Sequence, residues 1–439
     1  MEHIIKNFDI LASSPLRRQA LQIAEAGLEA INTRIAVRRT VAYDARGQVM
    51  RVGGKKYRLQ DFDRVVCVGF GKAAYDAVSE LQAMLAGRIS CGFVIDLKEG
   101  DLGNIVCKIG THPYPTKVNI EATRQLLAML SSCTEKDLVL CVVSGGGSAL
   151  LCSPRDLTCE QEVAIIAGLT VKGAAIQELN TVRKHISTVK GGQLAKMMYP
   201  ATVISLIFSD VPGDDVSMVA SGPTVLDATT ARDAKAIIDK YDVLATAGLP
   251  SCNLIETPKD EKYFRKVNNV LAVSARQALL AMKDRAEELG YDVAIFSDHY
   301  QGQARDLASV IVNTGRPAPL RRFWSGSPRQ VLLGAGESTV KILGKGEGGR
   351  NQEMALAALP LLAERQVLVC VASDGHDNTD AAGAIVDQPI AARAKALGLD
   401  PGFYLNNNDS YHFFQDTGGL LMTGLTGANV SDFFVLLSS

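Results

Sequence analysis

A lysine lies in a glycine-rich turn near the start of the chain, directly after a short apolar run. Residues 65–74 read Val-Val-Cys-Val-Gly-Phe-Gly-Lys-Ala-Ala. The β-branched run predicts a buried strand, Gly69 and Gly71 allow a tight turn, and the alanines favour a helix. A strand, a glycine turn and a helix start direct free N–H groups at one point, which suits an anion. Lys72 would neutralise a phosphoryl group or bind a carboxylate there.

The same turn also fits two other interpretations. Gly69-x-Gly71-x-x-Ala74 matches the dinucleotide fingerprint, and Asp96 follows at about the expected distance. A closely packed turn with a solvated lysine would look the same, so this motif alone decides nothing.

A second glycine loop follows the apolar run Leu138–Val143. It reads Ser144, Gly145, Gly146, Gly147, Ser148. Three consecutive glycines cost chain entropy, which indicates a backbone that approaches a ligand closely, although a flexible turn is the simpler alternative. Because the flanking serines can hydrogen-bond oxygens, we expect the loop to bind nucleotide phosphates.

Two aspartates stand directly after predicted strands. Asp210 follows Val203–Phe208 and Asp374 follows Val367–Ala372, in each case with one serine between. Carboxylates in such positions commonly hold Mg²⁺, so both are candidate metal ligands.

Cationic and amide side chains form two further candidate groups. Arg350 follows a glycine-rich segment at a predicted helix start, where a guanidinium can bind phosphoryl or carboxylate oxygens in a bidentate manner. Asn180 and Arg183 belong to a polar, basic segment that would bind an acidic substrate or simply form a solvated face.

Composition excludes several classes of protein. The chain has 439 residues, is 47% hydrophobic and 21% charged, and carries a formal net charge of −1. Nothing favours a nucleic acid or membrane partner, and no apolar stretch is long enough for a membrane helix. The nine cysteines form no C-x-x-C pair, so we expect a reduced, cytoplasmic protein without structural zinc. The Walker A pattern is absent, which excludes an ordinary P-loop kinase.

Strands alternating with helices predict an α/β fold with two domains. We expect an N-terminal Rossmann-like domain with a parallel sheet over residues 1–255 and a smaller C-terminal α/β domain over 256–439, with a cleft between them. The further predicted strands are Cys91–Ile95, Val270–Ser274, Val293–Ser297 and Val331–Leu333. The predicted helices are Pro15–Ile31, Ala73–Leu85, Ile120–Leu130, Glu160–Leu169, Arg276–Leu289, Gln303–Thr314 and Asn351–Ala363.

Taken together, these segments resemble the glycerate 2-kinase family, whose C-terminal part is the MOFRL domain. The matching stretches include Gly69-Phe-Gly-Lys-Ala-Ala, Ser144-Gly-Gly-Gly-Ser-Ala, Asn180-Thr-Val-Arg-Lys-His, Ser209-Asp-Val-Pro-Gly-Asp-Asp and Gly349-Arg-Asn-Gln-Glu, in family order. The resemblance implies phosphorylation of D-glycerate on its 2-hydroxyl, with ATP and Mg²⁺. It also implies that Lys72 and Arg350 are central to an interdomain site.

The resulting hypothesis assigns roles to these residues. The Ser144–Ser148 loop holds ATP, Lys72 and Arg350 bind glycerate's carboxylate and the migrating phosphoryl group, and Asn180 and Arg183 help to bind the substrate. Of Asp210 and Asp374, one holds Mg²⁺ and the other accepts the hydroxyl proton. By analogy with other transition-state arginines, loss of Arg350 would lower the rate on the order of 10³-fold.

Two alternatives remain open at this point. An NAD(P)H-dependent hydroxypyruvate reductase would use the Gly69 turn and Asp96, and a non-catalytic binder of a sugar acid or nucleotide would keep the glycine loops. The sequence does not give the oligomeric state, for which we consider a homodimer.

Overall fold

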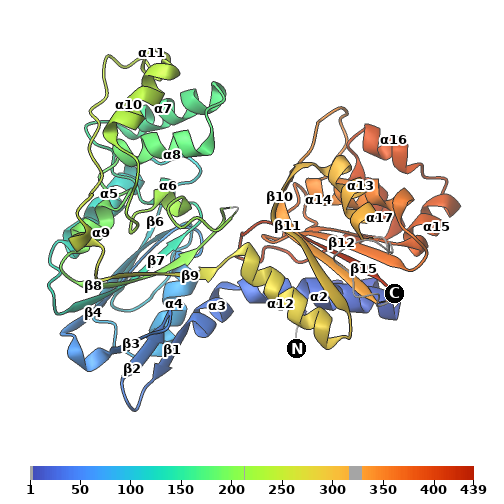
Figure 1. The fold of residues 1–439 in the computed structure, drawn as a ribbon, viewed down its shortest axis with the longest axis horizontal. Helices are drawn as coiled ribbons and strands as arrows, with labels where there is room; N and C mark the ends of the chain where they lie inside the picture. The colour runs from blue at the N-terminus through green and yellow to red at the C-terminus, as the bar shows by residue number, and fades with distance from the viewer. Residues whose placement is uncertain (1–2, 212, 316–328) are drawn as a thin grey trace. The chain divides into compact units, whose positions relative to one another are not determined.

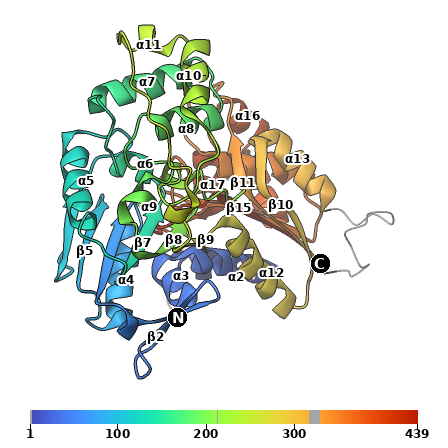
Figure 2. The ribbon, with the colours of Figure 1, turned by 60° about the vertical axis from the view of Figure 1, so that its left-hand side comes forward.

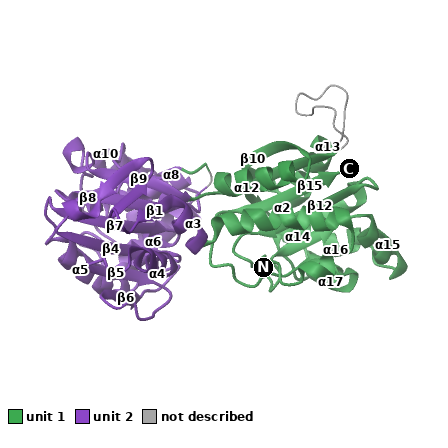
Figure 3. Ribbon diagram, turned by 90° about the horizontal axis from the view of Figure 1, so that it is seen from below, with its two compact units in different colours: residues 1–32, 212–214, 273–439 green, residues 33–211, 215–272 purple. Residues whose placement is uncertain are grey.

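The computed structural model describes residues 3–211, 213–315 and 329–439. The chain forms two compact units, which Figure 3 distinguishes by colour. Unit 1 holds the residues up to Asn32 and Val273–Ser439, with the short segment around Gly213, and unit 2 holds Thr33–Val211 and Asp215–Ala272. The domain boundary predicted at residues 255 and 256 lies within unit 2, because the chain re-enters unit 1 only at Val273.

Unit 2 is built on a six-stranded sheet with the order β6-β5-β4-β7-β8-β9. The strands from β4 to β8 are parallel, and in chain order they stand 3-2-1-4-5, which is the Rossmann arrangement. The predicted Rossmann-like parallel sheet is therefore confirmed. The bounds are β4 (Arg64–Phe70), β5 (Cys91–Asp96), β6 (Ile105–Ile109), β7 (Asp137–Ser144), β8 (Thr202–Phe208) and β9 (Val267–Val273).

One strand belongs to a different sheet from the one expected. The run Val270–Ser274 was expected to begin the C-terminal domain, but β9 lies beside β8 in the N-terminal sheet. Local apolar pattern identifies a strand but not its neighbour, because pairing is decided by contacts distant in sequence.

The helices of unit 2 fall into two groups. The helices α4 (Ala74–Leu85) and α5 (Lys117–Leu130) pack on the strands. The helices α7 (Cys159–Val171), α8 (Ile176–His185), α10 (Ala231–Lys240) and α11 (Val243–Thr246) surround a small core of their own, and they cluster together in Figures 1 and 2. The remaining elements of unit 2 are α3 (Thr33–Thr40), α6 (Gly147–Leu150), α9 (Gln193–Met198) and the antiparallel sheet β1 (Val41–Asp44), β2 (Val49–Val52), β3 (Lys55–Arg58).

Unit 1 contains a mixed sheet with the order β10-β11-β15-β12-β13-β14. Only β10 and β11 are parallel, and every other neighbouring pair is antiparallel. The last strand, which the sequence analysis did not predict, lies in the middle of this sheet between β11 and β12. The bounds are β10 (Asp292–Gln303), β11 (Gln330–Thr339), β12 (Gln366–Ala372), β13 (Gly383–Val386), β14 (Leu420–Leu421) and β15 (Asp432–Ser438).

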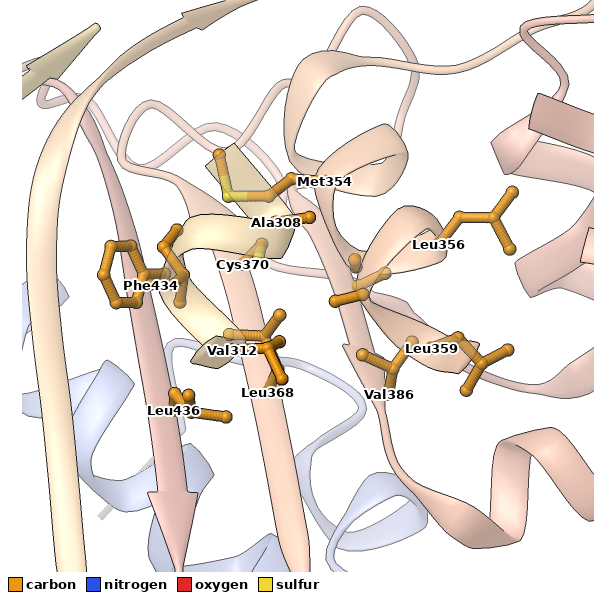
Figure 4. Close-up of a cluster of buried hydrophobic side chains, with 14 of the residues drawn as sticks. Ala308, Val312, Met354, Leu356, Leu359, Leu368, Cys370, Val386, Phe434 and Leu436 are labelled. Carbon is orange, nitrogen blue, oxygen red and sulfur yellow. The ribbon is translucent and has the colours of Figure 1, made fainter. Parts of the chain in front are cut away.

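Helices cover both faces of this sheet, so all seven residues of β12 are buried. On one face, Leu368 and Cys370 pack with Phe434, Leu436 and Met354, as Figure 4 shows. Because side chains alternate along a strand, Val367 and Val369 point to the other face, where α2 packs. The helices are α1 (Phe8–Leu11), α2 (Pro15–Ile31), α12 (Ala275–Glu288), α13 (Ala304–Thr314), α14 (Arg350–Ala358), α15 (Gln388–Ala396), α16 (Pro401–Asn406) and α17 (Ser410–Thr417).

The N-terminal helix α2 is thus part of the C-terminal unit. It begins at Pro15, as predicted, and the structure shows Ser14 as its N-cap. Its Arg17 is buried and donates two hydrogen bonds of 2.6 Å to Asp387, from Nε and Nη2. This ion pair joins segments that lie 370 residues apart in sequence.

Two further findings concern the cysteines and the apolar character of the helices. All nine cysteines are free thiols in the structure. Among the described residues, no helix has both the length and the apolar character required to span a bilayer.

Candidate functional site

Two glycine turns meet in unit 2 at the point where the strand order of the sheet reverses. The chain leaves β4 toward β5 on one side, whereas β7 pairs with β4 on the other side. The backbone N–H of Lys72, after β4, donates to the carbonyl oxygen of Gly145, after β7, at 2.9 Å. Open α/β sheets bind ligands in the crevice at this switch point, so the position of Lys72 matches that rule.

The turn after β4 does not itself offer an anion site. The N–H of Ala73 donates to Ser144 Oγ at 3.1 Å, and the N–H of Tyr75 donates to Asp96 Oδ2 at 2.8 Å. The N–H of Ala74 is bound to the carbonyl of Gly71. The expectation that these amides bind phosphate is therefore wrong, because protein groups already accept from them.

Asp96 has a structural role rather than the role that a dinucleotide site requires. It is 1% exposed, and its second oxygen accepts from the N–H of Leu97. Burial raises the pKa of the carboxyl, while the hydrogen bonds from backbone N–H groups favour the charged form. Because one oxygen caps the start of α4 and the other accepts from Leu97, Asp96 is not available to bind a ribose, which weakens the reductase interpretation.

The loop after β7 has the properties expected of a close approach to a ligand. A Cβ on Gly145 would lie 2.3 Å from Oδ2 of Asp210, and one on Gly147 would lie 2.7 Å from Cβ of Ala220. Gly146 has a φ of 77°, and a Cβ there would lie 3.2 Å from Cε of Lys72. These contacts explain the three glycines, and they bring Asp210 and Lys72 to the same loop.

The amides of this loop are available, unlike those after β4. Within the described residues, the N–H groups of Gly146, Gly147 and Ser148 donate to no protein acceptor. Such N–H groups in one turn form a concave site suited to anionic oxygens. Of the two glycine turns for which the sequence predicted an anion site, the second thus keeps N–H groups without a protein acceptor in the described part of the chain.

The serines of the loop have different surroundings. Ser144 links the two turns through the hydrogen bond from Ala73, and it is 2% exposed. Ser148 Oγ lies 3.0 Å from Ser221 Oγ, which donates to Asn180 Oδ1 at 2.8 Å. Asn180 is 4% exposed, so the structure places it behind Ser148, where it orients the hydroxyl through Ser221.

A cavity of about 480 Å³ opens beside this loop. Its walls are the segment His112–Pro115 after β6, the loop residues Gly146 and Ser148, one face of α7, and Arg183 of α8. The volume is within the ordinary range for small-molecule sites. Arg183, predicted from sequence, therefore joins the glycine loop at one cavity.

Arg183 brings a positive charge to the lining of this cavity. No described side chain forms a hydrogen bond or ion pair with Arg183, and burial lowers the pKa of its guanidinium while nearby Glu162 opposes that effect. Glu162 itself binds the ammonium of Lys190 at 2.7 Å. An unpaired guanidinium at a cavity wall is suited to an anionic ligand.

His112 is a site residue that the sequence analysis missed. A Cβ on Gly146 would lie 3.1 Å from Cδ2 of His112, so the imidazole flanks the same glycine as Lys72. Burial and the adjacent Lys72 charge lower the pKa of His112, which keeps the ring neutral at pH 7. The sequence could have indicated His112 by its position shortly after a strand, but that strand, β6, was not predicted.

Unit 1 holds the other two predicted catalytic residues. Arg350 is the first residue of α14 and donates to Asp432 from Nε at 2.5 Å and Nη2 at 3.2 Å. Nη2 also donates to Glu337 at 2.9 Å. Burial disfavours the charged guanidinium, but the two carboxylates outweigh this effect and raise the pKa of Arg350.

The carboxylates near Arg350 were also missed by the sequence analysis. Burial raises the pKa of Asp432 to about 7, against the lowering effect of Arg350. Asp377, also buried, accepts from the backbone N–H groups of Asn351 at 3.1 Å and Gln352 at 2.8 Å, and thereby fixes the start of α14. Burial raises the pKa of Asp377 as well.

Asp374 lies near the same edge of the unit 1 sheet. It comes two residues after Ala372, whose partner on β15 is Asp432. Its Oδ1 accepts from the N–H of His376 at 3.0 Å. Asp374 belongs to unit 1, whereas Asp210 belongs to unit 2. The described residues contain no cluster of three His, Cys, Asp or Glu side chains that could hold a metal.

Comparisons with known proteins identify the family. Residues 19–251 match a family described as a domain of unknown function, DUF4147, and residues 330–432 match the MOFRL family. The D-glycerate 2-kinase of Thermotoga maritima is 35% identical over 427 residues, covering 96% of this chain and 98% of the relative. A protein of Agrobacterium vitis named putative hydroxypyruvate reductase is 37% identical over 386 residues, covering 85% of this chain and 87% of that protein.

Solved structures agree with this assignment. The crystal structure of glycerate kinase from Thermotoga maritima matches with a TM-score of 0.82 at 34% identity and covers 96% of this chain and 99% of its own. The α/β fold and the resemblance found in the sequence are both confirmed. The chain belongs to the glycerate 2-kinase family of kinases.

Proposed function

We propose that the protein transfers the γ-phosphoryl group of ATP to the 2-hydroxyl of D-glycerate, with Mg²⁺, and releases 2-phosphoglycerate and ADP. The observation that carries this proposal is the meeting of Lys72, Arg183 and the unpaired amides of the Gly146–Ser148 loop at the switch point of a Rossmann sheet. Phosphoryl transfer requires cations and N–H donors that together bind the anionic phosphoryl group. The names of the relatives, which are glycerate kinases, indicate that glycerate is the acceptor of the phosphoryl group.

In this proposal the residues of unit 2 hold the nucleotide. The N–H groups of Gly146 to Ser148 bind phosphate oxygens, Lys72 neutralises the charge of the migrating group, and neutral His112 donates one further hydrogen bond. Asp210 holds Mg²⁺, since its carboxylate lies against Gly145 in the same loop. Mg²⁺ is commonly held by one or two protein carboxylates, with phosphate oxygens and water as its other ligands, so a single aspartate is sufficient.

Arg350 and Asp374 of unit 1 are proposed for the same reaction on the strength of the family resemblance. Arg350 binds the acid's carboxylate or the transferred phosphoryl group, and Asp374 accepts the hydroxyl proton. In the transfer, the 2-hydroxyl oxygen bonds to phosphorus, the bond from phosphorus to the ADP oxygen breaks, and the proton passes to Asp374.

The test is incubation of the purified chain with ATP, Mg²⁺ and D-glycerate, followed by ³¹P NMR. The proposal predicts a metal-dependent signal of 2-phosphoglycerate that is lost in Lys72→Ala. Formation of 3-phosphoglycerate would keep the kinase and contradict the position of transfer. Oxidation of NADH with hydroxypyruvate, without phosphoryl transfer, would instead support the reductase.

A further inference from the structure

The residues that line the cavity of unit 2 form two chemically different groups, which we call its two ends. One end carries the glycine loop, His112 and Arg183, and suits anionic oxygens. The other end is lined by α7, and its residues recur at positions 163, 166, 167, 170 and 171. This is the spacing of one helical face, so a continuous strip of α7 lines the cavity.

That strip is unusual because α7 already has an apolar face in the core. Ile165 and Leu169 are fully buried against α8 and α11. The cavity face adds Val163, Ile166 and Ala167, and Val171 at its end is 88% exposed. Ile166 also packs against that core, but the core does not account for Val163, Ala167 and Val171, whereas a ligand with an apolar surface does.

Another part of the lining carries two prolines and an aromatic ring. It consists of Pro113, Tyr114 and Pro115, and Tyr114 is 64% exposed. Fully buried Asn119 accepts from the backbone N–H of Thr111 at 3.1 Å and donates to the carbonyl of Ala149 at 3.0 Å. The wall is thereby tied to the glycine loop, which fixes the distance between the apolar end and the anionic end.

We propose that the apolar end is the slot for the adenine base of the nucleotide whose phosphates bind the glycine loop, with Arg183 facing those phosphates. This inference rests on the proposed function and adds a base-binding site to it. A three-carbon acid has no apolar surface for the α7 strip and leaves most of 480 Å³ unfilled. A purine is flat and apolar on its faces, so it fits between Tyr114 and Ile166, and it is joined to phosphates that reach Gly146.

The first test measures binding to the full chain by calorimetry, without glycerate, using ADP and tripolyphosphate as probes. Ala167→Phe fills the slot from an exposed position and should weaken ADP binding by about tenfold or more, with tripolyphosphate binding unchanged. Ala236→Phe, on the exposed face of α10, is the matched control and should bind both probes as the natural chain does. Tyr114→Ala should weaken ADP binding by about five- to a hundredfold through lost stacking.

The outcomes separate this inference from the proposed function. Unchanged ADP binding in both Ala167→Phe and Tyr114→Ala would overturn the base slot even if glycerate is phosphorylated. In the same two variants, a raised KM for D-glycerate with an unchanged KM for ATP would also overturn the base slot, because the slot would then hold the acid. Selective loss of ADP binding in a chain that does not phosphorylate glycerate would support the slot and contradict the proposed reaction.

Discussion

The carboxylate of Asp432 holds the guanidinium of Arg350 through two hydrogen bonds, at 2.5 and 3.2 Å. Asp432 is 2% exposed and begins a central, fully buried strand of the unit 1 sheet, so it fixes Arg350 to the core of that unit. Glu337, the second partner of Arg350, has a side chain that is half exposed. We therefore assign the orientation of Arg350 mainly to Asp432.

Replacing Asp432 should change the pH dependence of turnover. Its pKa of about 7 means that the carboxylate is lost as the pH falls below neutrality, and with it the ionic partner of Arg350. In the natural chain kcat should rise with pH through about 7, whereas Asp432→Asn should show a flatter profile and a kcat reduced by roughly tenfold at pH 8. Glu337→Gln is the control and should keep the rise. An unchanged profile in Asp432→Asn would show that Asp432 does not act through Arg350.

The same substitution should alter how stability depends on pH. The pKa of Asp432 is about 7 in the folded chain, and an aspartate in an unfolded chain has a pKa of about 3.9. Between these values the folded state holds a proton that the unfolded state has released, so this contribution to stability falls as the pH rises from about 4 to about 7. Urea denaturation should show that decline in the natural chain and a weaker decline in Asp432→Asn. An equal decline in both chains would contradict the assignment.

Lys72 should be required for catalysis rather than for folding. Its backbone N–H carries the link to Gly145, and its ammonium forms no hydrogen bond or ion pair with any described residue, so Lys72→Met keeps the link and removes only the charge. We expect kcat to fall on the order of 10²-fold or more, with an unchanged midpoint of thermal unfolding. Lys98→Met, which removes an exposed lysine after β5, is the control and should keep full activity. A comparable loss in both variants would indicate a general effect of charge.

Asp96 should matter for stability and not for nucleotide choice. Because it caps α4 with one oxygen and accepts from the N–H of Leu97 with the other, Asp96→Ala should lower the free energy of unfolding by about 1–2 kcal/mol, measured by urea denaturation. The KM for ATP should stay within about twofold. Binding of NADH by the natural chain and its loss in Asp96→Ala would revive the dinucleotide interpretation.

Asp210 and Asp374 should respond differently to Mg²⁺. Chelation of the metal should stop turnover. Asp210→Asn should raise the Mg²⁺ concentration for half-maximal activity by about tenfold, because one charged ligand is lost. Asp374→Asn should lower kcat at an unchanged Mg²⁺ requirement, because a proton acceptor is lost. The reverse pattern would exchange the two roles.

Local chemistry made several of these features predictable from sequence alone. Ser14 and Pro15 determined where α2 begins, and the β-branched runs determined β4, β7 and β8 almost to the residue. Three successive glycines required a close approach at residues 145–147, and the motif order identified the family. These signals depend on neighbours in the chain, which the sequence displays directly.

Only the tertiary structure decided which groups share a site. The first glycine turn lost its anion site because Ser144 and Asp96, distant in sequence, accept its N–H groups. His112 lies beside Lys72, and Asp432 binds Arg350, although the members of these pairs are 40 and 82 positions apart in the sequence and no periodicity reveals them. The sheet brings such residues together by hydrogen bonding strands in an order that differs from chain order, so contacts of this kind follow from the fold and not from local pattern.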